Sequence, residues 1–332
     1  MKNFVVLSYG RKSEYHRALF AIFSFWSWYS GRPDTVQTIL YTDAPEFFEP
    51  YLRGLPVVYV PLTPERLADM CGPDHYVHRV KVTLVEEAFR SYPKHDILYS
   101  DTDAFFVRDP ASLLQEFTPG VSFLHQPEYL LSEAVAVFAS YGQAQFPSRF
   151  LELLQSKTFL IAGKQVQLLT NQPAWNSGVI GLSNAAAPLL PDIGALTDEL
   201  YAYSRWFTTE QLAFTLVLQH QTTLLPCDQY VFHYWGKRQK VFVDGLLRAL
   251  LTEGFRQSGL SDKLERVKHL TQLWQNRIEL DRLQEGSIYA FNNQQVKAGL
   301  KYTLKALLKG RPSAYYVKRL LALARCNLSK AA

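Results

Sequence analysis

Cysteine, methionine and long apolar runs are scarce in this chain. The 332 residues include three cysteines and two methionines, and Cys71, Cys227 and Cys326 lie far apart without a CxxC or metal-binding spacing. An odd set of distant cysteines argues against a disulfide framework and favours a reducing compartment. The apolar stretches near the N-terminus and at residues 18–30 are too short for a signal peptide or a membrane span. We therefore expect a cytoplasmic protein.

Acidic residues are absent from the C-terminal end of the chain. Hydrophobic residues make up 48% and charged residues 20% of the sequence, which is typical of a globular protein with a sizeable core. The formal net charge is +5, yet residues 293–332 alone contain nine basic side chains, which leaves a net −4 on residues 1–292. Because the lysine face of this tail has no interleaved aromatics and the rest is acidic, a nucleic-acid binder is disfavoured.

Strand-like and helix-like segments alternate along the first part of the chain. Their order predicts an α/β fold with a mostly parallel central sheet flanked by helices. From about Gly259 the pattern is helical, with a helix that begins at Ser261 or Asp262 and ends at Gly286. We therefore expect a catalytic domain over residues 1–245 and a helical C-terminal region over 246–332. The predicted strands are 3–10, 36–45, 55–62 and 96–100, and the predicted helices between them are 16–30 and 77–93.

Two aspartates interrupt an otherwise apolar segment, "HDILYSDTDAFFVRDP". In an extended chain Asp101 and Asp103 point to the same face, and two close carboxylates need a shared proton or a cation. A hard divalent ion that bridges to phosphate oxygens meets that need. Asp109 followed by Pro110 predicts a capped helix, so the pair lies where a strand ends and ligands bind in parallel α/β sheets.

Further polar motifs follow this segment in a fixed order. They are "WNSGVIGLS", "TTEQLAF" and "FHYWGKRQK". Together with "DILYSDTDAFF" they resemble the motifs of GT-A glycosyltransferases, particularly those of family 8, over about residues 3–245. The resemblance implies a GT-A fold and transfer of a sugar from a nucleotide-diphosphate donor, most often a UDP-sugar, to a glycan or lipid-linked acceptor. Such acceptors occur in cell-surface polysaccharide synthesis. The resemblance also implies retention of anomeric configuration, whereas a chain in which Glu210 acted as a base on the acceptor would invert it.

The resemblance assigns a role to each residue that matches the family's motifs. Asp101 and Asp103 would hold the metal with His233 as the third ligand, and an imidazole beside two carboxylates suits Mn²⁺ better than Mg²⁺. Glu210 and Gln211 would act at the donor sugar near the reacting carbon. The expected substrate-binding residues are Tyr9, Arg17, Asp43, Arg79, Lys81, Thr102, Asn176, Ser177, Gly178, Gly236 and Lys237.

The chain departs from the family pattern at two places. The lysine that contacts the donor diphosphate in the family corresponds here to Gln239, with Lys237 and Lys240 on either side. Ser8 and Tyr9 stand where the family has an acidic residue near the end of the first strand. Tyr9 is placed to stack on the donor's base, and the identity of that base stays open.

Several of these residues also have ordinary structural interpretations. His233 alone fits a satisfied histidine at a strand end, and Asp43 fits a turn. Arg79 and Lys81 fit a solvated helix face, and Glu210 fits a favourable charge at a helix N-terminus.

Two other functions fit the same fold. A sugar nucleotidyltransferase normally has a glycine-rich N-terminal loop followed by a lysine, and "SYGRKSEYHR" is poor in glycine. A catalytically silent scaffold at a membrane surface would be expected to lack the aspartates or His233.

The basic tail has its own periodicity. Lys297, Lys301, Lys305 and Lys309 recur at intervals of four, which places them on one helix face. A neighbouring apolar stripe makes the segment similar to an interfacial helix on an anionic membrane leaflet. The alternative is an amphipathic helix packed on the catalytic domain with its lysines in water. The apolar stripe consists of Val296, Leu300, Leu304, Leu307 and Leu308.

Overall fold

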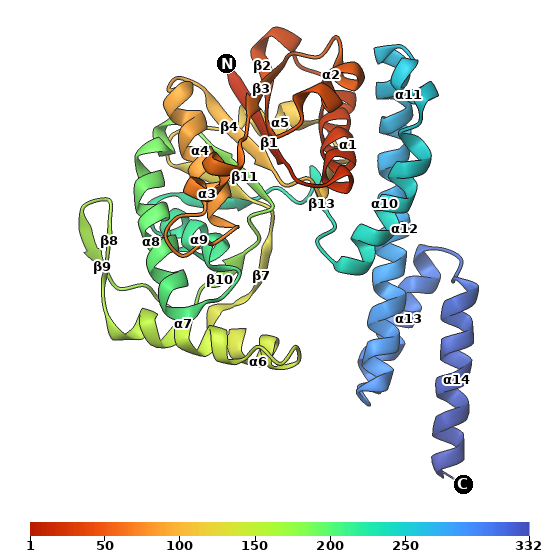
Figure 1. Cartoon of the computed structure of the whole chain (residues 1–332). Coiled ribbons are helices and arrows are strands. Elements are labelled where there is room, and N and C mark those ends of the chain that lie inside the picture. Colours follow the sequence, from red (N-terminus) through yellow and green to blue (C-terminus); the bar gives the residue numbers. More distant parts are fainter. Residues whose placement is uncertain (332) are drawn as a thin grey trace. The chain divides into compact units, whose positions relative to one another are not determined.

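The computed structural model describes residues 1–331, with side chains to Leu323 (Figure 1). The chain forms two compact units, Met1–Val267 and Lys268–Ala332, and each is described by itself. Arg325, Cys326 and Lys330, which belong to the predicted tail, lie outside the described side chains. The domain limits expected from the sequence, 1–245 and 246–332, stay a prediction, because compactness alone does not show where a catalytic domain ends.

A seven-stranded sheet forms the centre of the first unit, in the order β12-β6-β11-β4-β1-β2-β3. All neighbouring pairs are parallel except those of β11, which is antiparallel to both β4 and β6. The predicted α/β class with a mostly parallel sheet is therefore confirmed. The strands are β1 (Lys2–Ser8), β2 (Val36–Thr42), β3 (Val57–Pro61), β4 (Asp96–Ser100), β6 (Val121–Leu124), β11 (Val179–Leu182) and β12 (Thr223–Pro226).

Helices bury both faces of this sheet, which explains why its strands are apolar runs without alternation. On one face Phe4 of β1 stacks on Phe25 of α1, and on the other Val5 joins the core formed with α4, α8 and α9. The middle of α1 is buried on every side, as its uniformly apolar sequence requires. The helices are α1 (Lys12–Trp28), α2 (Pro45–Leu52), α3 (Pro64–Met70), α4 (Arg79–Ser91), α5 (Pro110–Gln115), α6 (Ala134–Ala139), α7 (Gln145–Ser156), α8 (Leu190–Ser204), α9 (Thr209–Gln221), α10 (Lys237–Leu250) and α11 (Glu253–Gln257).

Short strand pairs extend the first unit beyond the central sheet. The sequence predicts neither these pairs nor α2 and α3, because elements of this length carry too few residues for a clear period. As predicted, Asp109 caps α5, and its side chain accepts the Ala111 N–H at 2.9 Å. The pairs are β5 (Ala104–Phe106) with β13 (Val231–His233), β7 (Pro127–Leu130) with β10 (Pro173–Trp175), and β8 (Phe159–Ile161) with β9 (Lys164–Val166).

The C-terminal part is helical, as predicted, and consists of the end of α12 (Leu260–Asn292), α13 (Val296–Lys309) and α14 (Ala314–Ala331). The predicted end of the first of these helices at Gly286 is wrong, because α12 continues through that residue. Gly286 lies against the ring of Tyr302, and the next residue, Ser287, hydrogen-bonds Thr303 of α13 at 2.7 Å. Packing between helices thus overrides the helix-ending tendency of glycine. No described helix has the length and apolar character needed to cross a bilayer.

Candidate active site

The two aspartates lie in the turn between β4 and β5, just beyond the carboxyl end of a central strand. The backbone on each side is fixed by hydrogen bonds. The Asp101 N–H donates to the Gly178 carbonyl at 2.8 Å, and the Tyr234 N–H donates to the Asp103 carbonyl at 2.9 Å. In the β5–β13 pair, Ala104 lies opposite His233. This register brings the imidazole beside the aspartate turn.

Asp101, Asp103 and His233 converge as the sequence analysis expected. One ligand atom from each lies within 4.8 Å of the others, a geometry that could hold a metal ion. His233 Nε2 is 3.1 Å from Asp103 Oδ1, and Asp103 is only 5% exposed. Two carboxylates and an imidazole form a donor set that could bind a divalent metal ion.

Asn176 and Gly178 position the imidazole. The Asn176 side-chain oxygen lies 2.9 Å from His233 Nδ1 and also accepts the Gly178 N–H at 2.9 Å. A Cβ atom at Gly178 would come 2.1 Å from His233 Cε1, so only glycine leaves room for the ring. The "NSG" motif therefore serves the metal-ligand cluster directly.

Two lysines balance the two carboxylates. Lys81 Nζ lies 3.2 Å from Asp101 Oδ2 and 3.1 Å from Glu210 Oε1, and Lys240 Nζ lies 2.6 Å from Asp103 Oδ2. Burial alone would lower the pKa of Lys81, but Asp101 and Glu210 raise that pKa above its ordinary value. Burial alone would raise the pKa of Asp103, but His233 and Lys240 hold that pKa well below its usual range. Lys81 and Asp103 are therefore charged at neutral pH, and the site offers carboxylates to a cation and ammonium groups to an anion.

Glu210 and Gln211 begin α9 and face the same cluster. Glu210 accepts the Ser177 hydroxyl at 3.0 Å and the Tyr76 hydroxyl at 3.2 Å. Gln211 Nε2 donates to Glu128 Oε2 at 3.1 Å. Burial opposes ionisation of Glu210, but Lys81 and His78 outweigh it and lower the pKa of the carboxyl group.

A cavity of about 660 Å³ opens over these groups. Its lining combines the metal-ligand cluster, both lysines and the first turn of α9 with aromatic side chains. Glu128 and the aromatic residues were not predicted, because no motif marks them and short elements and loops bring them to the site. The aromatic lining residues are Tyr129, Phe138, Tyr141, Phe207 and Trp235.

A second cavity, of about 430 Å³, adjoins the first and shares Lys81, Asp101, Asp103 and Lys240 with it. Tyr9 and Thr102 line this cavity. Burial raises the pKa of Tyr9, so its hydroxyl stays neutral and its ring is available for packing. The metal-ligand cluster thus lies between two connected hollows.

Two predicted residues, Asp43 and Arg17, support this second cavity from outside it. Asp43 accepts the Gly10 N–H at 2.9 Å and the Tyr15 hydroxyl at 2.8 Å, so it fixes the loop that carries Tyr9. Arg17 pairs with Glu14 at 2.6 Å and with Asp244, and Glu14 in turn accepts the Thr102 hydroxyl at 2.8 Å. These geometries fit positioning roles better than ligand contact.

The remaining predicted residues lie farther from the cluster. Arg79 pairs with Asp198 at 2.5 Å, which directs its guanidinium to α8. Lys81, about half a turn further along the same helix, instead points to the cluster. Gly236 precedes α10 and Lys237 is exposed in its first turn. Neither lines the two cavities, whereas Lys240 lines both.

Comparisons with known proteins give matches among solved structures only. No protein-family model and no curated protein matches the sequence. Mouse xyloside xylosyltransferase 1 aligns with 68% of this chain and 84% of its own at 15% identity and a TM-score of 0.46. The glycosyltransferase GlyE of Streptococcus pneumoniae TIGR4 aligns with 80% of this chain at 14% identity and a TM-score of 0.46. The match spans 63% of GlyE, less than two thirds of its length.

The galactosyltransferase LgtC, solved with donor and acceptor sugar analogues, is also similar. It aligns with 76% of this chain and 99% of its own at 13% identity and a TM-score of 0.43. All three are glycosyltransferases, the class that the motifs of this chain resemble, while membership of family 8 stays a prediction. All three TM-scores lie below 0.5.

Proposed function

We propose that this protein is a metal-dependent GT-A glycosyltransferase that moves a sugar from a nucleotide-diphosphate donor to a glycan or lipid-linked acceptor. A UDP-sugar is the expected donor, and cell-surface polysaccharide synthesis the expected setting. The observation that carries the proposal is the convergence of Asp101, Asp103 and His233 between two cavities that also contain lysine ammonium groups. Carboxylates for a cation beside ammonium groups for an anion are what a metal-bound diphosphate requires.

Charge that develops on the leaving diphosphate accounts for the roles of the charged residues. Mn²⁺, or Mg²⁺, held by Asp101, Asp103 and His233 would supply positive charge to the diphosphate. We assign the second positive charge to Lys240, rather than to the predicted Lys237, because Lys240 reaches both cavities. Preorganised charge of this kind acts where the transition state becomes negative.

The two cavities divide the substrates between them. Tyr9 in the smaller cavity would stack on the donor's base, and the sugar would extend past the cluster toward Asn176 and Gln211 in the larger one. Glu210 forms an ion pair with Lys81 and accepts a hydrogen bond from Ser177. We therefore infer that it orients the site and does not deprotonate the acceptor. This favours retention over inversion, with Gln211 at the reacting carbon.

Hydrolysis of a panel of UDP-sugars tests the proposal without a known acceptor. We expect slow release of UDP from one donor that requires Mn²⁺ and falls by about a hundredfold in Asp103→Asn, the scale on which one preorganised electrostatic group acts. Asp228→Asn, an exposed aspartate outside both cavities, is the matched control and should keep full activity. Metal-independent turnover, or equal rates in the two variants, would contradict the assignment.

The second unit supports a further part of the proposal, peripheral binding to an anionic membrane from the cytoplasmic side. On α13, Lys297, Lys301 and Lys305 are exposed. Beside them, Leu300 and Leu304 are each 59% exposed and Leu308 is 80% exposed. On one helix, lysines can contact the anionic headgroups of a lipid surface while neighbouring exposed leucines insert among the acyl chains. Lys309, the last residue of the predicted lysine stripe, instead pairs with Glu279.

Sedimentation with vesicles tests this part separately. The full-length protein should bind vesicles rich in anionic lipid and ignore neutral ones, and high salt should weaken the binding. Because each surface lysine contributes about 1 kcal/mol, Lys301→Gln with Lys305→Gln should weaken binding roughly thirtyfold. Lys94→Gln with Lys164→Gln, on exposed lysines of the first unit, is the charge-matched control. Equal loss in both double variants would mean that only total charge matters.

A further inference from the structure

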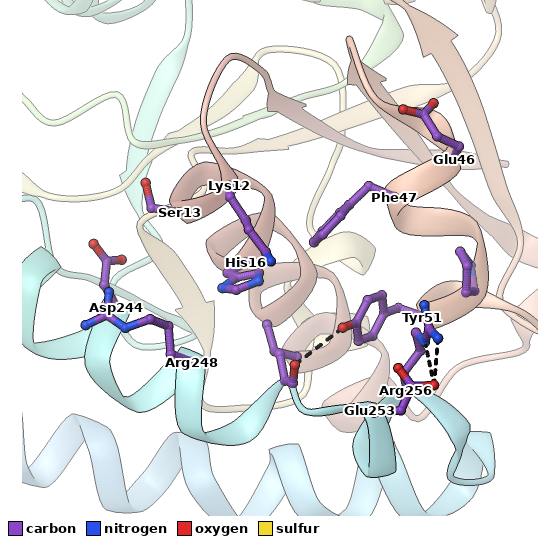
Figure 2. A pocket seen from close by; sticks show the side chains of 12 residues that line it. Lys12, Ser13, His16, Glu46, Phe47, Tyr51, Asp244, Arg248, Glu253 and Arg256 are labelled. Carbon is purple, nitrogen blue, oxygen red and sulfur yellow. Dashed lines mark hydrogen bonds and ion pairs between the residues drawn. The ribbon is translucent and has the colours of Figure 1, made fainter.

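A separate hollow of the first unit takes no part in the candidate active site. It has a volume of about 910 Å³ and lies among α1, α2, α10 and α11 (Figure 2). It shares no lining residue with the two cavities beside the aspartates. Its chemistry therefore needs an explanation of its own.

Positive charge in this hollow is not fully balanced. Lys12 on α1 and Arg248 on α10 line it, and in the described part of the chain no carboxylate forms an ion pair with either. Among the acidic residues that line the hollow, Asp244 forms an ion pair with Arg17, which lies outside it, with 2.7 Å between Oδ2 and the guanidinium nitrogen. Glu253 pairs with Arg256 at 2.6 Å, which leaves Glu46 as an exposed carboxylate at the edge. The hollow consequently favours an anion over a cation.

His16 lies between these two cations and strengthens that preference. Its side chain is buried against Phe47, with 5.8 Å between the ring centroids. Burial lowers the pKa of His16, Lys12 and Arg248 lower it further, and Asp244 opposes them. A neutral imidazole can donate one hydrogen bond to an incoming anion, and that anion would favour a second proton on the ring.

An aromatic surface borders the cationic side of the hollow. Phe47 and Tyr51 from α2 line it together, with 5.8 Å between their ring centroids. The Tyr51 hydroxyl donates to the carbonyl of Leu251, another lining residue, at 3.4 Å, so its proton is already engaged within the lining. Figure 2 shows Lys12, His16 and Phe47 around the same space, with Arg248 on the neighbouring helix. Aromatic faces pack against flat or weakly polar ring surfaces.

We propose that this hollow is a second ligand site, which binds a small sugar phosphate. The phosphate contacts Lys12, His16 and Arg248, and the sugar ring packs on Phe47 and Tyr51. Basic side chains provide the charge-assisted hydrogen bonds that a phosphate accepts, and the volume exceeds that of one phosphate group several times over. The site is independent of the proposed glycosyl transfer, so failure of either proposal leaves the other standing.

Calorimetric titration of the full-length protein in EDTA tests the site without a metal at the aspartates. The probes are glucose 1-phosphate, inorganic phosphate and glucose. We expect saturable binding of glucose 1-phosphate, weaker binding of phosphate, and none of glucose at the same concentration. Lys12→Gln and Arg248→Gln should each weaken binding of glucose 1-phosphate about tenfold, because each removes one charge-assisted contact. In Lys94→Gln, an exposed lysine elsewhere in the first unit, binding should be unchanged.

A Lys240→Gln variant separates this hollow from the candidate active site. Binding that survives in Lys240→Gln and weakens in Arg248→Gln supports the proposal. Binding that is lost in Lys240→Gln but kept in Arg248→Gln would place the phosphate at the aspartates and overturn it. Absence of saturable binding in the parent protein, or phosphate binding as tight as that of the sugar ester, would overturn it as well. Unfolding temperatures equal to that of the parent protein show that the variants are folded.

Discussion

Lys81 is the residue whose charge connects the most groups of the candidate site. Its ammonium group contacts Asp101, Glu210 and Ser177, and the side chain is buried. The Lys81–Glu210 pair is the more buried of its two ion pairs. Removing one partner of such a pair leaves an uncompensated charge, which costs more than removing both.

The first prediction concerns this pair. Lys81→Met should lower the free energy of unfolding by about 3–5 kcal/mol at neutral pH, and adding Glu210→Gln should recover part of that loss. In the parent protein the pKa of Glu210 is lowered. The ion pair therefore stabilises the folded state fully at pH values above the carboxyl group's unfolded pKa, and its contribution decreases as the pH falls below that pKa. Without Lys81, burial raises that pKa, so the loss in Lys81→Met should shrink from pH 7.5 to pH 5. Urea unfolding at pH 7.5 and pH 5 measures this loss of stability, and an equal loss at the two pH values would contradict the prediction.

The second prediction concerns Gly178. A methyl group there would overlap the His233 ring, with its Cβ 2.1 Å from Cε1, so Gly178→Ala should displace the imidazole. We expect Mn²⁺ affinity, measured by calorimetry, to fall at least tenfold, the scale seen when groups that orient metal ligands are changed. Gly194→Ala is the matched control, because the nearest atom to its Cβ is 3.9 Å away and alanine favours helix. Unaltered Mn²⁺ binding in Gly178→Ala would remove His233 from the ligand set.

At the scale of elements, α10 carries residues of both proposed ligand sites of the first unit, the candidate active site and the separate hollow. Lys240, Asp244 and Arg248 are spaced by four residues, so they lie along one side of this helix. Lys240 reaches Asp103, while Asp244 accepts two hydrogen bonds from Arg17 of α1, both at 2.7 Å. The Arg17 pair therefore attaches the middle of α10, one turn beyond Lys240, to α1.

The third prediction tests that attachment. Asp244→Asn should cost about 2 kcal/mol of unfolding free energy, the scale of a hydrogen bond to a charged group, because Arg17 is buried. Amide hydrogen exchange at the start of α10 should become faster, while exchange in β1 and β4 stays slow. Glu253→Gln breaks an exposed ion pair on α11 and should change stability much less, because water screens that pair. Equal effects of the two substitutions would show that the Arg17 pair does not hold the helix.

At the scale of the whole molecule, the proposed ligands bind one unit of two. Every residue of the metal-ligand cluster and of both adjoining cavities belongs to Met1–Val267. Ligand that binds only folded protein raises stability by mass action, by about 2.7 kcal/mol at a hundredfold excess over the dissociation constant.

The fourth prediction follows for calorimetric unfolding of the full-length protein. Mn²⁺ with a bound UDP-sugar should raise the unfolding temperature of the first unit by several degrees, given about 2–4 °C per kcal/mol for domains of this size. Asp103→Asn should abolish the shift, and EDTA should reverse it in the parent protein. A shift that persists in Asp103→Asn would mean that the stabilising metal binds elsewhere.

Local pattern was enough to predict the architecture and the paired aspartates, whereas His233 was assigned through the resemblance of the ordered motifs to those of GT-A glycosyltransferases. Apolar runs such as residues 96–100 must become buried strands, and the aspartates that follow must then lie at a strand end. Asp101, Asp103 and His233 were recognisable because their motifs occur in order along the chain. The helical C-terminal region was predictable for the same reason, since its periodicity extends over many turns.

Tertiary structure alone decided which charged residues reach the cluster. Arg79 and Lys81 are two positions apart on α4, and the helical turn directs one to Asp198 and the other to Asp101. On α10, Lys240 rather than Lys237 pairs with Asp103, because the two lysines leave the helix in different directions. Glu128 joins through a strand pair that no motif announces, and Gly286 stays helical because α13 packs on it. In each case the deciding contact joins segments distant in sequence, and their meeting depends on packing rather than on local pattern.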